Sequence, residues 1–203
     1  MSTRRTPILV FDVESGVERV ASLLYHLSFR ELEAIDKTWK LYFEVAELEA
    51  IMREKPPSIL PDTIGWNWAK KLRVATAHDE NWDFYGIEYR DVLQGALVVD
   101  LTPHPCEAEV HEGENALCIE FIATAPWNYR PLMDGLSRKP FLKGIGPALI
   151  NVAISMSRHL GYDGRLVLFS VDKRETQDFY DNVCGMTKVG PSNTTANYSI
   201  GLK

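Results

Sequence analysis

The segment that most restricts how this chain can fold is a nearly continuous apolar run, ALCIEFIATA, at residues 116–125. A strand with one solvated face alternates apolar and polar side chains, so an unbroken run predicts a strand that is covered on both faces. Glu120 is the only charged residue in this run. The next segment, 127–142, is rich in proline and basic residues and is expected to be a loop, whereas 146–160 has the apolar spacing of a helix.

Similar patterns predict the other elements. We expect strands at 7–13, 85–89, 94–101, 165–171, 186–189 and 198–202, and helices at 17–27, 29–55, 66–76 and 172–183. The second of these helices would be ended by Pro56-Pro57. Its predicted apolar face consists of Leu41, Val45, Leu48 and Met52. This order of strands and helices indicates a mixed α/β fold.

Charge and length argue against several classes of protein. The chain has 203 residues, which suits one domain, and its formal net charge of −6 without a basic stripe argues against nucleic-acid partners. A mildly acidic surface instead suits a cationic substrate such as an amine. No apolar run reaches the ~18 residues of a membrane helix, and no signal peptide is recognisable. We therefore expect no membrane partner and a cytoplasmic location. Cys106, Cys118 and Cys184 have unrelated spacings, which argues against a disulfide framework.

A glycine turn, Lys143-Gly144-Ile145-Gly146, joins the expected loop to the helix that follows. Glycines let backbone N–H groups approach a ligand, and a helix N-terminus adds unpaired donors and partial positive charge, so this turn suits a pyrophosphate group. It is not a Walker loop, because no Gly-Lys-Ser/Thr follows, and Leu149 stands where a dinucleotide fingerprint has its third glycine. A tight turn without a ligand is the alternative at this point.

Three segments, taken in order, resemble the acetyl-CoA-dependent N-acetyltransferase superfamily (GNAT). They are IEFIATAP at 119–126, KGIGPALINVAISMSRHLGYDGRLVLFSV at 143–171 and FYDNVCGMTKVG at 179–190. In that family a strand ends in a proline-containing turn, a glycine-rich loop opens a helix that cradles the CoA pyrophosphate, and a later helix carries a tyrosine. The resemblance covers 94–190. It implies a single GNAT-like domain over 1–203, with an N-terminal helical region at 1–83 on the acceptor side and the acetyl-CoA-binding core at 94–190.

The resemblance implies a mixed, largely antiparallel central sheet flanked by helices. The parallel strands 116–125 and 165–171 would splay apart and leave a slot for the pantetheine arm of acetyl-CoA, the expected co-substrate. Phe141 replaces the Gln or Arg of the family, so phosphate contacts would come from backbone groups. The residues expected to bind acetyl-CoA are Ala123, Thr124, Ala125, Lys143, Gly144, Ile145, Gly146 and Ala148.

The resemblance also assigns two catalytic residues. Tyr180 would protonate the departing thiolate, although it lies five residues before Gly185, where four is commoner in the family. Glu120 would be the general base, since a carboxylate within an apolar strand is costly to bury and is seldom idle. The alternatives are that Tyr180 is a core aromatic residue and that Glu120 faces solvent or pairs with an arginine.

The remaining candidates surround the expected acceptor. Trp127 and Asn128 are expected on the substrate side, with a loop anchor and a turn residue as the alternatives. No metal is expected, because the spacing of His104, Cys106, His111 and Cys118 matches no common zinc template. The expected function is transfer of an acetyl group to a primary amine of a small molecule or peptide, by a chain that could form a homodimer. The alternative is a non-catalytic acyl-CoA-binding or protein-interaction module with the same fold.

Overall fold

The structure is a computed structural model that describes residues 4–171, 173–189 and 195–200. The chain divides into two compact units, and each is described by itself. The first consists of Met1–Glu80, Phe84–Ala96 and Ala123–Ile145. The second consists of Asn81–Asp83, Leu97–Ile122 and Gly146–Lys203. Among the described residues, no helix is both long and apolar enough to cross a membrane.

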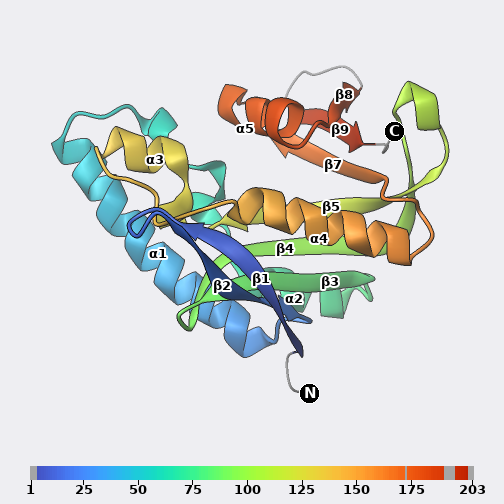
Figure 1. Ribbon diagram of the computed structural model, residues 1–203, viewed down its shortest axis with the longest axis horizontal. Coiled ribbons are helices and arrows are strands. Elements are labelled where there is room, and N and C mark those ends of the chain that lie inside the picture. Colours follow the sequence, from blue (N-terminus) through green and yellow to red (C-terminus); the bar gives the residue numbers. More distant parts are fainter. Residues whose placement is uncertain (1–3, 172, 190–194, 201–203) are drawn as a thin grey trace. The chain divides into compact units, whose positions relative to one another are not determined.

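The first unit contains a sheet with the strand order β6-β1-β2-β3-β4 (Figure 1). β2 pairs antiparallel with both β1 and β3, and β6 pairs antiparallel with the end of β1. The strands are β1 (Arg4–Asp12), β2 (Val17–Tyr25), β3 (Trp82–Tyr89), β4 (Val92–Pro105) and β6 (Leu142–Lys143), of which β3 and β4 continue into the second unit.

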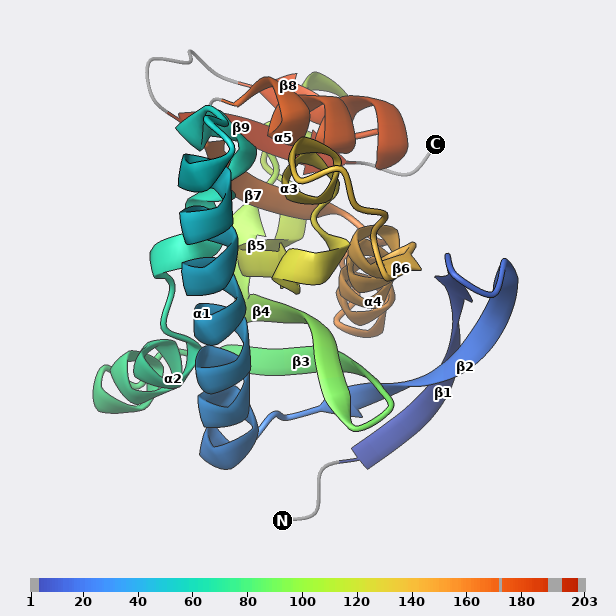
Figure 2. The ribbon, with the colours of Figure 1, turned by 90° about the vertical axis from the view of Figure 1, so that its left-hand side faces the viewer.

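β2 corrects the prediction of a helix at 17–27. The segment forms the second strand of a hairpin with β1, which Figure 2 shows as a long, twisted ribbon. The turn is held by Asp12, whose Oδ1 accepts the N–H groups of Glu14 and Ser15 at 3.1 Å each, and by Gly16, whose φ is 69°. The apolar residues of 17–27 fit a helical spacing, but pairing with strands on both sides outweighs that local preference. The sequence signal for the hairpin was the presence of Asp12 and Gly16, two residue types that favour turns, at the two ends of the connection.

Helix α1 (Phe29–Met52) forms as predicted, but it buries a different face. Its N-terminus has a capping box between Ser28 and Glu31. The buried residues are Leu32, Ile35, Trp39, Phe43, Ala46 and Ala50. The predicted core face is exposed instead, with Leu41 at 64%, Val45 at 54%, Leu48 at 63% and Met52 at 84%. The helix has two apolar stripes, and the one with the large aromatic rings packs, because it removes more apolar surface from water.

A carboxylate of α1 caps the next helix. Asp36 accepts the backbone N–H groups of Trp68 at 2.7 Å and Ala69 at 3.0 Å, at the start of α2 (Trp68–Ala77). Free N–H groups at a helix N-terminus favour such an anion. The helix predicted at 66–76 is therefore confirmed, and the segment before it contains two short 3-10 turns, Pro57–Ile59 and Asp62–Gly65.

The segment 127–142, expected to be a loop, is partly helical and packed. It contains a 3-10 turn at Pro126–Asn128 and the short helix α3 (Arg130–Gly135). Leu132, Met133 and Leu136 are buried. Two arginines tie the segment to α1, since Arg138 pairs with Glu49 at 2.7 Å and Arg53 donates to the Leu136 carbonyl at 3.0 Å. Its apolar side chains thus form part of the core of the first unit.

The second unit contains a sheet with the strand order β4-β5-β7-β9-β8. β7 pairs parallel with β5 and antiparallel with β9, which pairs antiparallel with β8. The new elements are β5 (Asn115–Thr124), α4 (Ile145–His159), β7 (Leu166–Val171), α5 (Arg174–Asp178), a π-helical turn (Phe179–Val183), β8 (Thr187–Val189) and β9 (Thr195–Ile200). The predicted fold class, a mixed α/β fold with a largely antiparallel sheet and one parallel pair, is confirmed. Residue 172 of the predicted helix 172–183 and residues 201–202 of the predicted strand 198–202 lie outside the described residues.

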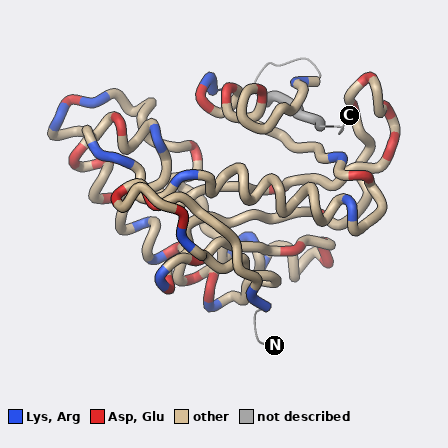
Figure 3. The backbone as a smooth tube through the Cα atoms, viewed as in Figure 1, with Lys and Arg blue, Asp and Glu red and all other residues tan. Residues whose placement is uncertain are grey.

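Charge is unevenly distributed over these elements. Figure 3 shows α1 marked by both signs of charge, whereas α4 and β5 carry almost none. In β5 the one charged residue is Glu120, and in α4 the only lysine or arginine is Arg158, in the last turn. Glu120 and Arg158 are therefore the charged residues of these two elements.

Candidate functional site

The two parallel strands of the second unit separate partway along their length. β5 and β7 are paired only from Leu117↔Leu166 to Ile119↔Leu168, although both strands continue beyond that point (Figure 1). The burial of β5 changes at the same place, because residues 116–119 are buried on both faces and Glu120, Phe121 and Ile122 are half-buried. The predicted splay of these strands is confirmed, and among the described residues it leaves strand backbone without a partner strand on that side.

Gly144 is the conformational centre of the glycine turn. Its φ is +86°, and a Cβ built there would meet no heavy atom within 4 Å. This left-handed conformation favours glycine for backbone reasons alone. The residue before it, Lys143, lies in β6, and that strand is fixed by pairing with β1 and by the hydrogen bond from Val13 N to Phe141 O at 3.1 Å. The turn into α4 is thus held in place from its N-terminal side.

Gly146 serves a different purpose from the one that the sequence suggested. A Cβ at this position would lie 3.0 Å from Cζ and 3.1 Å from Cε2 of Phe179. The absent side chain therefore allows α4 to pack closely against an aromatic ring of the same unit. The position that a Cβ of residue 146 would occupy faces this ring and not open space for a phosphate. We expected a glycine here so that backbone could approach a ligand, and the structure gives helix packing as the reason instead.

Tyr180 lies in the π-helical turn, and that turn accounts for its unusual spacing. Cys184 N donates to Phe179 O at 3.0 Å, a five-residue step, and Met186 N donates to Tyr180 O at 2.9 Å. A π turn accommodates one extra residue in a helix, which explains why Tyr180 is five residues, rather than four, before Gly185. Its ring is buried, at 5.2 Å between centroids from Phe179. Its role as a proton donor stays a prediction.

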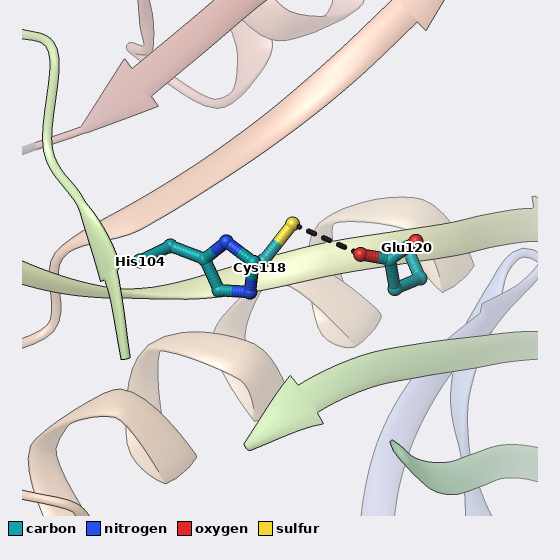
Figure 4. A group of neighbouring side chains, drawn as sticks. All are labelled: His104, Cys118 and Glu120. Carbon is teal, nitrogen blue, oxygen red and sulfur yellow. Dashed lines mark hydrogen bonds between the residues drawn. The ribbon is translucent and has the colours of Figure 1, made fainter. Parts of the chain in front are cut away.

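Glu120 belongs to a cluster of polar side chains on β4 and β5. The Cys118 thiol donates to Glu120 Oε1 at 3.4 Å. One side-chain nitrogen, sulfur or oxygen atom from each of His104, Cys118 and Glu120 lies within 4.8 Å of the corresponding atoms of the other two (Figure 4). Asp100 adds a fourth member, because its Oδ2 is 2.9 Å from His104 Nε2. The sequence suggested a Glu120 enclosed by apolar side chains, whereas the structure has it half-buried and hydrogen-bonded. Its role as a base stays a prediction.

The local environment sets the charge states in this cluster. Burial, and then the nearby Glu120 carboxylate, strongly raise the pKa of Cys118, so this residue is a neutral thiol and a poor nucleophile. Burial acts to raise the pKa of Asp100 as well. Hydrogen bonds from Thr102 N, at 2.8 Å, and from His104 outweigh burial and hold that pKa below its usual value. Asp100 is therefore a carboxylate beside an imidazole.

The cysteines and histidines considered for zinc do not meet in one place. Of His104, Cys106, His111 and Cys118, the structure brings together His104 and Cys118. His111 Nδ1 instead lies 3.2 Å from Glu114 Oε2, in the segment between β4 and β5. In the described part of the chain, His104, Cys118 and Glu120 are the one group of three side chains of the kinds that bind metal ions.

Gln94 organises the residues expected on the acceptor side. It is 1% exposed, and its Oε1 accepts the Trp127 indole N–H at 2.8 Å and the Asn128 amide at 3.0 Å. Its backbone carbonyl accepts Ala125 N at 2.8 Å. Asn128 Oδ1 in turn accepts Leu142 N at 2.8 Å, so Asn128 joins the two ends of the 127–142 segment. These bonds fix where Trp127 and Asn128 lie, and their part in substrate binding stays a prediction.

Sequence reasoning missed Gln94 and the Asp100–His104 pair. The available signal on β4 was the spacing of its polar residues. Asp100, Thr102 and His104 occupy every second position, and alternate residues of a strand lie on the same face of the sheet. Cys118 and Glu120 have the same spacing on β5. What the sequence does not contain is the register of the two strands, which decides whether the two sets of side chains meet.

Known structures share this arrangement of helices and strands. The chain is similar to a crystal structure of a GNAT family acetyltransferase from Listeria monocytogenes 4b F2365, with a TM-score of 0.54 and 13% identity over 97% of this chain and 100% of that one. The GNAT domain of S. lividans PAT has a TM-score of 0.54 and 10% identity, over 98% of this chain and 97% of that domain. The chain therefore has the GNAT fold. No protein-family model matches the sequence, and no curated protein matches it either.

Proposed function

We propose that this protein transfers an acetyl group from acetyl-CoA to a primary amine. The observation that carries the proposal is the early end of the β5–β7 pairing, at Ile119 and Leu168, within a GNAT fold. In the part of the chain that the structure describes, backbone groups beyond the last pair have no partner strand on that side. An extended pantetheine arm can bond to them much as an added strand would. The residues proposed for this contact are Ala123, Thr124 and Ala125, although Ala125 N already donates to Gln94 O.

The phosphates of acetyl-CoA are proposed to bind at the glycine turn. Gly144 has the left-handed conformation that exposes backbone donors, and α4 is a 15-residue helix that begins at Ile145. A helix N-terminus supplies unpaired N–H groups and partial positive charge to an anion. The proposed contacts are the backbone of Gly144, Ile145, Gly146 and Ala148, with Lys143 as the adjacent cation.

The chemistry requires one proton to leave the amine and another to reach the sulfur. In our proposal Glu120 removes a proton from the ammonium form of the acceptor, and the free amine attacks the thioester carbonyl. The tetrahedral intermediate then collapses, the C–S bond breaks, and Tyr180 gives a proton to the thiolate. The tyrosine recovers this proton from the nitrogen, so CoA thiol and amide are formed and one proton is released in each turnover.

The acceptor is proposed to be a small-molecule or peptide amine, with Trp127 and Asn128 on its side of the site. Both residues are held by the buried Gln94, so they present a fixed surface rather than a mobile one. A homodimer stays a prediction. So does the assignment of 1–203 to a single domain.

The second candidate function is acyl-CoA binding, or protein interaction, without catalysis. Phe141 favours it, because the family's side-chain contact to phosphate is missing here. In this case the fold would keep its cofactor slot and have no turnover.

Two measurements on one preparation separate the candidates. Acetyl-CoA at ~100 times its dissociation constant should add ~2.7 kcal/mol to the free energy of unfolding if the protein is an enzyme or an acyl-CoA-binding module. Release of CoA thiol in the presence of a panel of primary amines should be faster than hydrolysis without amine if the protein is an enzyme. Stabilisation without thiol release would support the binding module. No stabilisation by acetyl-CoA would refute both the enzyme and the acyl-CoA-binding module, and would favour a protein-interaction module.

A further inference from the structure

Helix α1 carries a second stripe of residues besides the one that it buries. α1 is one continuous helix of 24 residues (Figure 2). A series of its exposed residues follows alternating steps of four and three: Ala34, Thr38, Leu41, Val45, Leu48 and Met52. Such steps give a period of 3.5 residues, which is the spacing of the a and d positions of a coiled coil. This exposed stripe is therefore patterned like a helix–helix contact, although it faces solvent.

The exposed stripe leaves much apolar surface in water. Leu41, Val45, Leu48 and Met52 are each more than half exposed, and the neighbouring Ile51 is exposed as well. From its first residue to its last, the stripe extends over about 27 Å of helix. Monomeric proteins seldom expose large contiguous apolar patches, and such patches mark sites of protein–protein contact. A second helix lying along the stripe would remove this surface from water, which is the main favourable term in association.

The exposed stripe is complementary to a second copy of itself in the antiparallel direction. Aligning two copies about a two-fold axis opposite position 43 brings together positions 34 and 52, 38 and 48, and 41 and 45. Ala34 of one copy then meets the partner's Met52, and Thr38 meets the partner's Leu48. Each layer pairs a smaller with a larger side chain, as close packing requires. A parallel alignment would instead pair every residue with its own copy, so that two methionines meet at one end and two alanines at the other.

Charged residues beside the exposed stripe favour the same orientation. Lys37 and Lys40 lie beside its N-terminal half and Glu44 and Glu47 beside its C-terminal half, all exposed and on one flank. In an antiparallel pair this flank meets the same flank of the other helix, so the lysines of each copy come alongside the glutamates of its partner. Glu44 of the two copies would approach each other near the axis, and Lys40, whose Nζ is 3.8 Å from the Glu44 carboxylate, offsets their charge. A parallel pair would place Glu44 alongside the partner's Glu49, where like charges repel.

We propose that the protein forms a two-fold symmetric dimer in which the α1 helices of two copies pack antiparallel along the exposed stripe. The partner is a second copy of this chain because the stripe matches itself in both side-chain size and charge. The buried face of α1 would stay in the core of each copy, so the helix would be packed along both of its stripes. The inference concerns α1 of the first unit and does not depend on the proposed activity.

Val45→Glu tests this dimer. Val45 lies next to the two-fold axis, so the interface would receive one buried carboxylate from each copy. We expect the wild-type chain to sediment as a dimer at a concentration on the order of 100 µM, and the dissociation constant to rise by about 100-fold or more in the variant. Because Val45 is 54% exposed on a helix, the single chain should fold normally. Circular dichroism and melting temperature, measured in dilute solution, verify that it does.

Val20→Glu is the matched control. Val20 is 67% exposed and lies in β2 of the same unit. The substitution therefore makes the same change of charge and apolar surface at a position outside the exposed stripe. We expect the control to keep the wild-type dissociation constant, whereas a general effect of charge on association would weaken both variants alike.

Cysteine cross-linking tests the orientation of the two helices. Thr38→Cys and Leu48→Cys are made in separate chains, mixed and mildly oxidised. In the antiparallel dimer these two positions meet, so the mixture should form disulfide-linked dimers. Each variant alone should not, because its two new cysteines would lie about 15 Å apart along the helix, too far for a disulfide. The wild type, oxidised in the same way, measures any linkage through its own cysteines.

Three results would overturn the inference. The first is a monomeric wild type at the stated concentration. The second is a dimer that Val45→Glu leaves intact, or that Val20→Glu weakens as much, since the interface would then lie elsewhere. The third is cross-linking of each cysteine variant alone and not of the mixture, which would mean that the helices pair in parallel. Stabilisation by acetyl-CoA and release of CoA thiol test the proposed function separately from these results.

Discussion

Replacing Gly146 with alanine tests how α4 packs against the turn that carries Tyr180. The new methyl group would lie 3.0 and 3.1 Å from two ring atoms of Phe179, where carbon atoms prefer about 3.5–4.0 Å. Overpacking of this kind costs about 1–3 kcal/mol, while alanine gains up to about 1 kcal/mol over glycine in a helix. We therefore expect a net loss of about 1 kcal/mol in the free energy of unfolding.

The prediction is tested by making Gly146→Ala in a Phe179→Leu variant as well as in the wild type. The three ring atoms that lie within 4 Å of the new methyl group, Cζ, Cε2 and Cε1, do not exist in leucine. In that background Gly146→Ala should be neutral or stabilising, so its effect should change sign and the coupling between the two sites should be about 1–2 kcal/mol. Urea unfolding of the wild type, both single variants and the double variant measures this coupling. If Gly146→Ala costs the same in both backgrounds, the contact with Phe179 is not the reason for this glycine.

Three further changes test other parts of the molecule. Gly144→Ala should cost about 1–2 kcal/mol of stability, because its φ of +86° is left-handed although the space around it is open, and the thermal shift with acetyl-CoA should shrink. Tyr180→Phe should lower kcat without much change in melting temperature or in acetyl-CoA affinity; a folded variant with wild-type turnover would remove Tyr180 from the mechanism. Gln94→Ala should cost about 2–4 kcal/mol, because the N–H groups of Trp127 and Asn128 lose a buried acceptor, and unfolding in urea that matches the wild type would contradict this.

Local sequence patterns were sufficient for the elements around the proposed cofactor site. The apolar run at 116–125 and the glycine turn into α4 are defined by neighbouring residues, and both were predicted close to where they occur. Tyr180 was placed on the correct helix, although the π turn that positions it was visible only as an extra residue before Gly185.

The wrong predictions concern segments whose structure depends on contacts with residues far away in the sequence. Residues 17–27 have helical spacing but pair with two other strands, and α1 has two apolar stripes between which only the packed core can choose. The meeting of His104 on β4 with Cys118 and Glu120 on β5 depends on strand register. The Gln94 network depends on a contact with residues more than thirty positions away. None of these is encoded in a short window of sequence.

The pairing of β6 with the tip of β1 has a consequence for synthesis of the chain. Translation at about 5–20 residues per second exposes the β1–β2 hairpin on the order of ten seconds before Lys143 leaves the ribosome to pair with Phe11. During that interval the outer edge of β1 is open to other nascent chains, and its exposed Leu9 makes such pairing favourable.

β6 covers only Phe11 and Asp12 of that edge even when it arrives. The remainder of β1 begins with Arg4 and Arg5 and contains Pro7, and charge and proline on an edge strand oppose pairing with another chain. We therefore expect these three residues to protect the chain against aggregation while the protein is being made. Removing them should lower the yield of folded protein from cells more than it lowers the stability of the protein once it has folded.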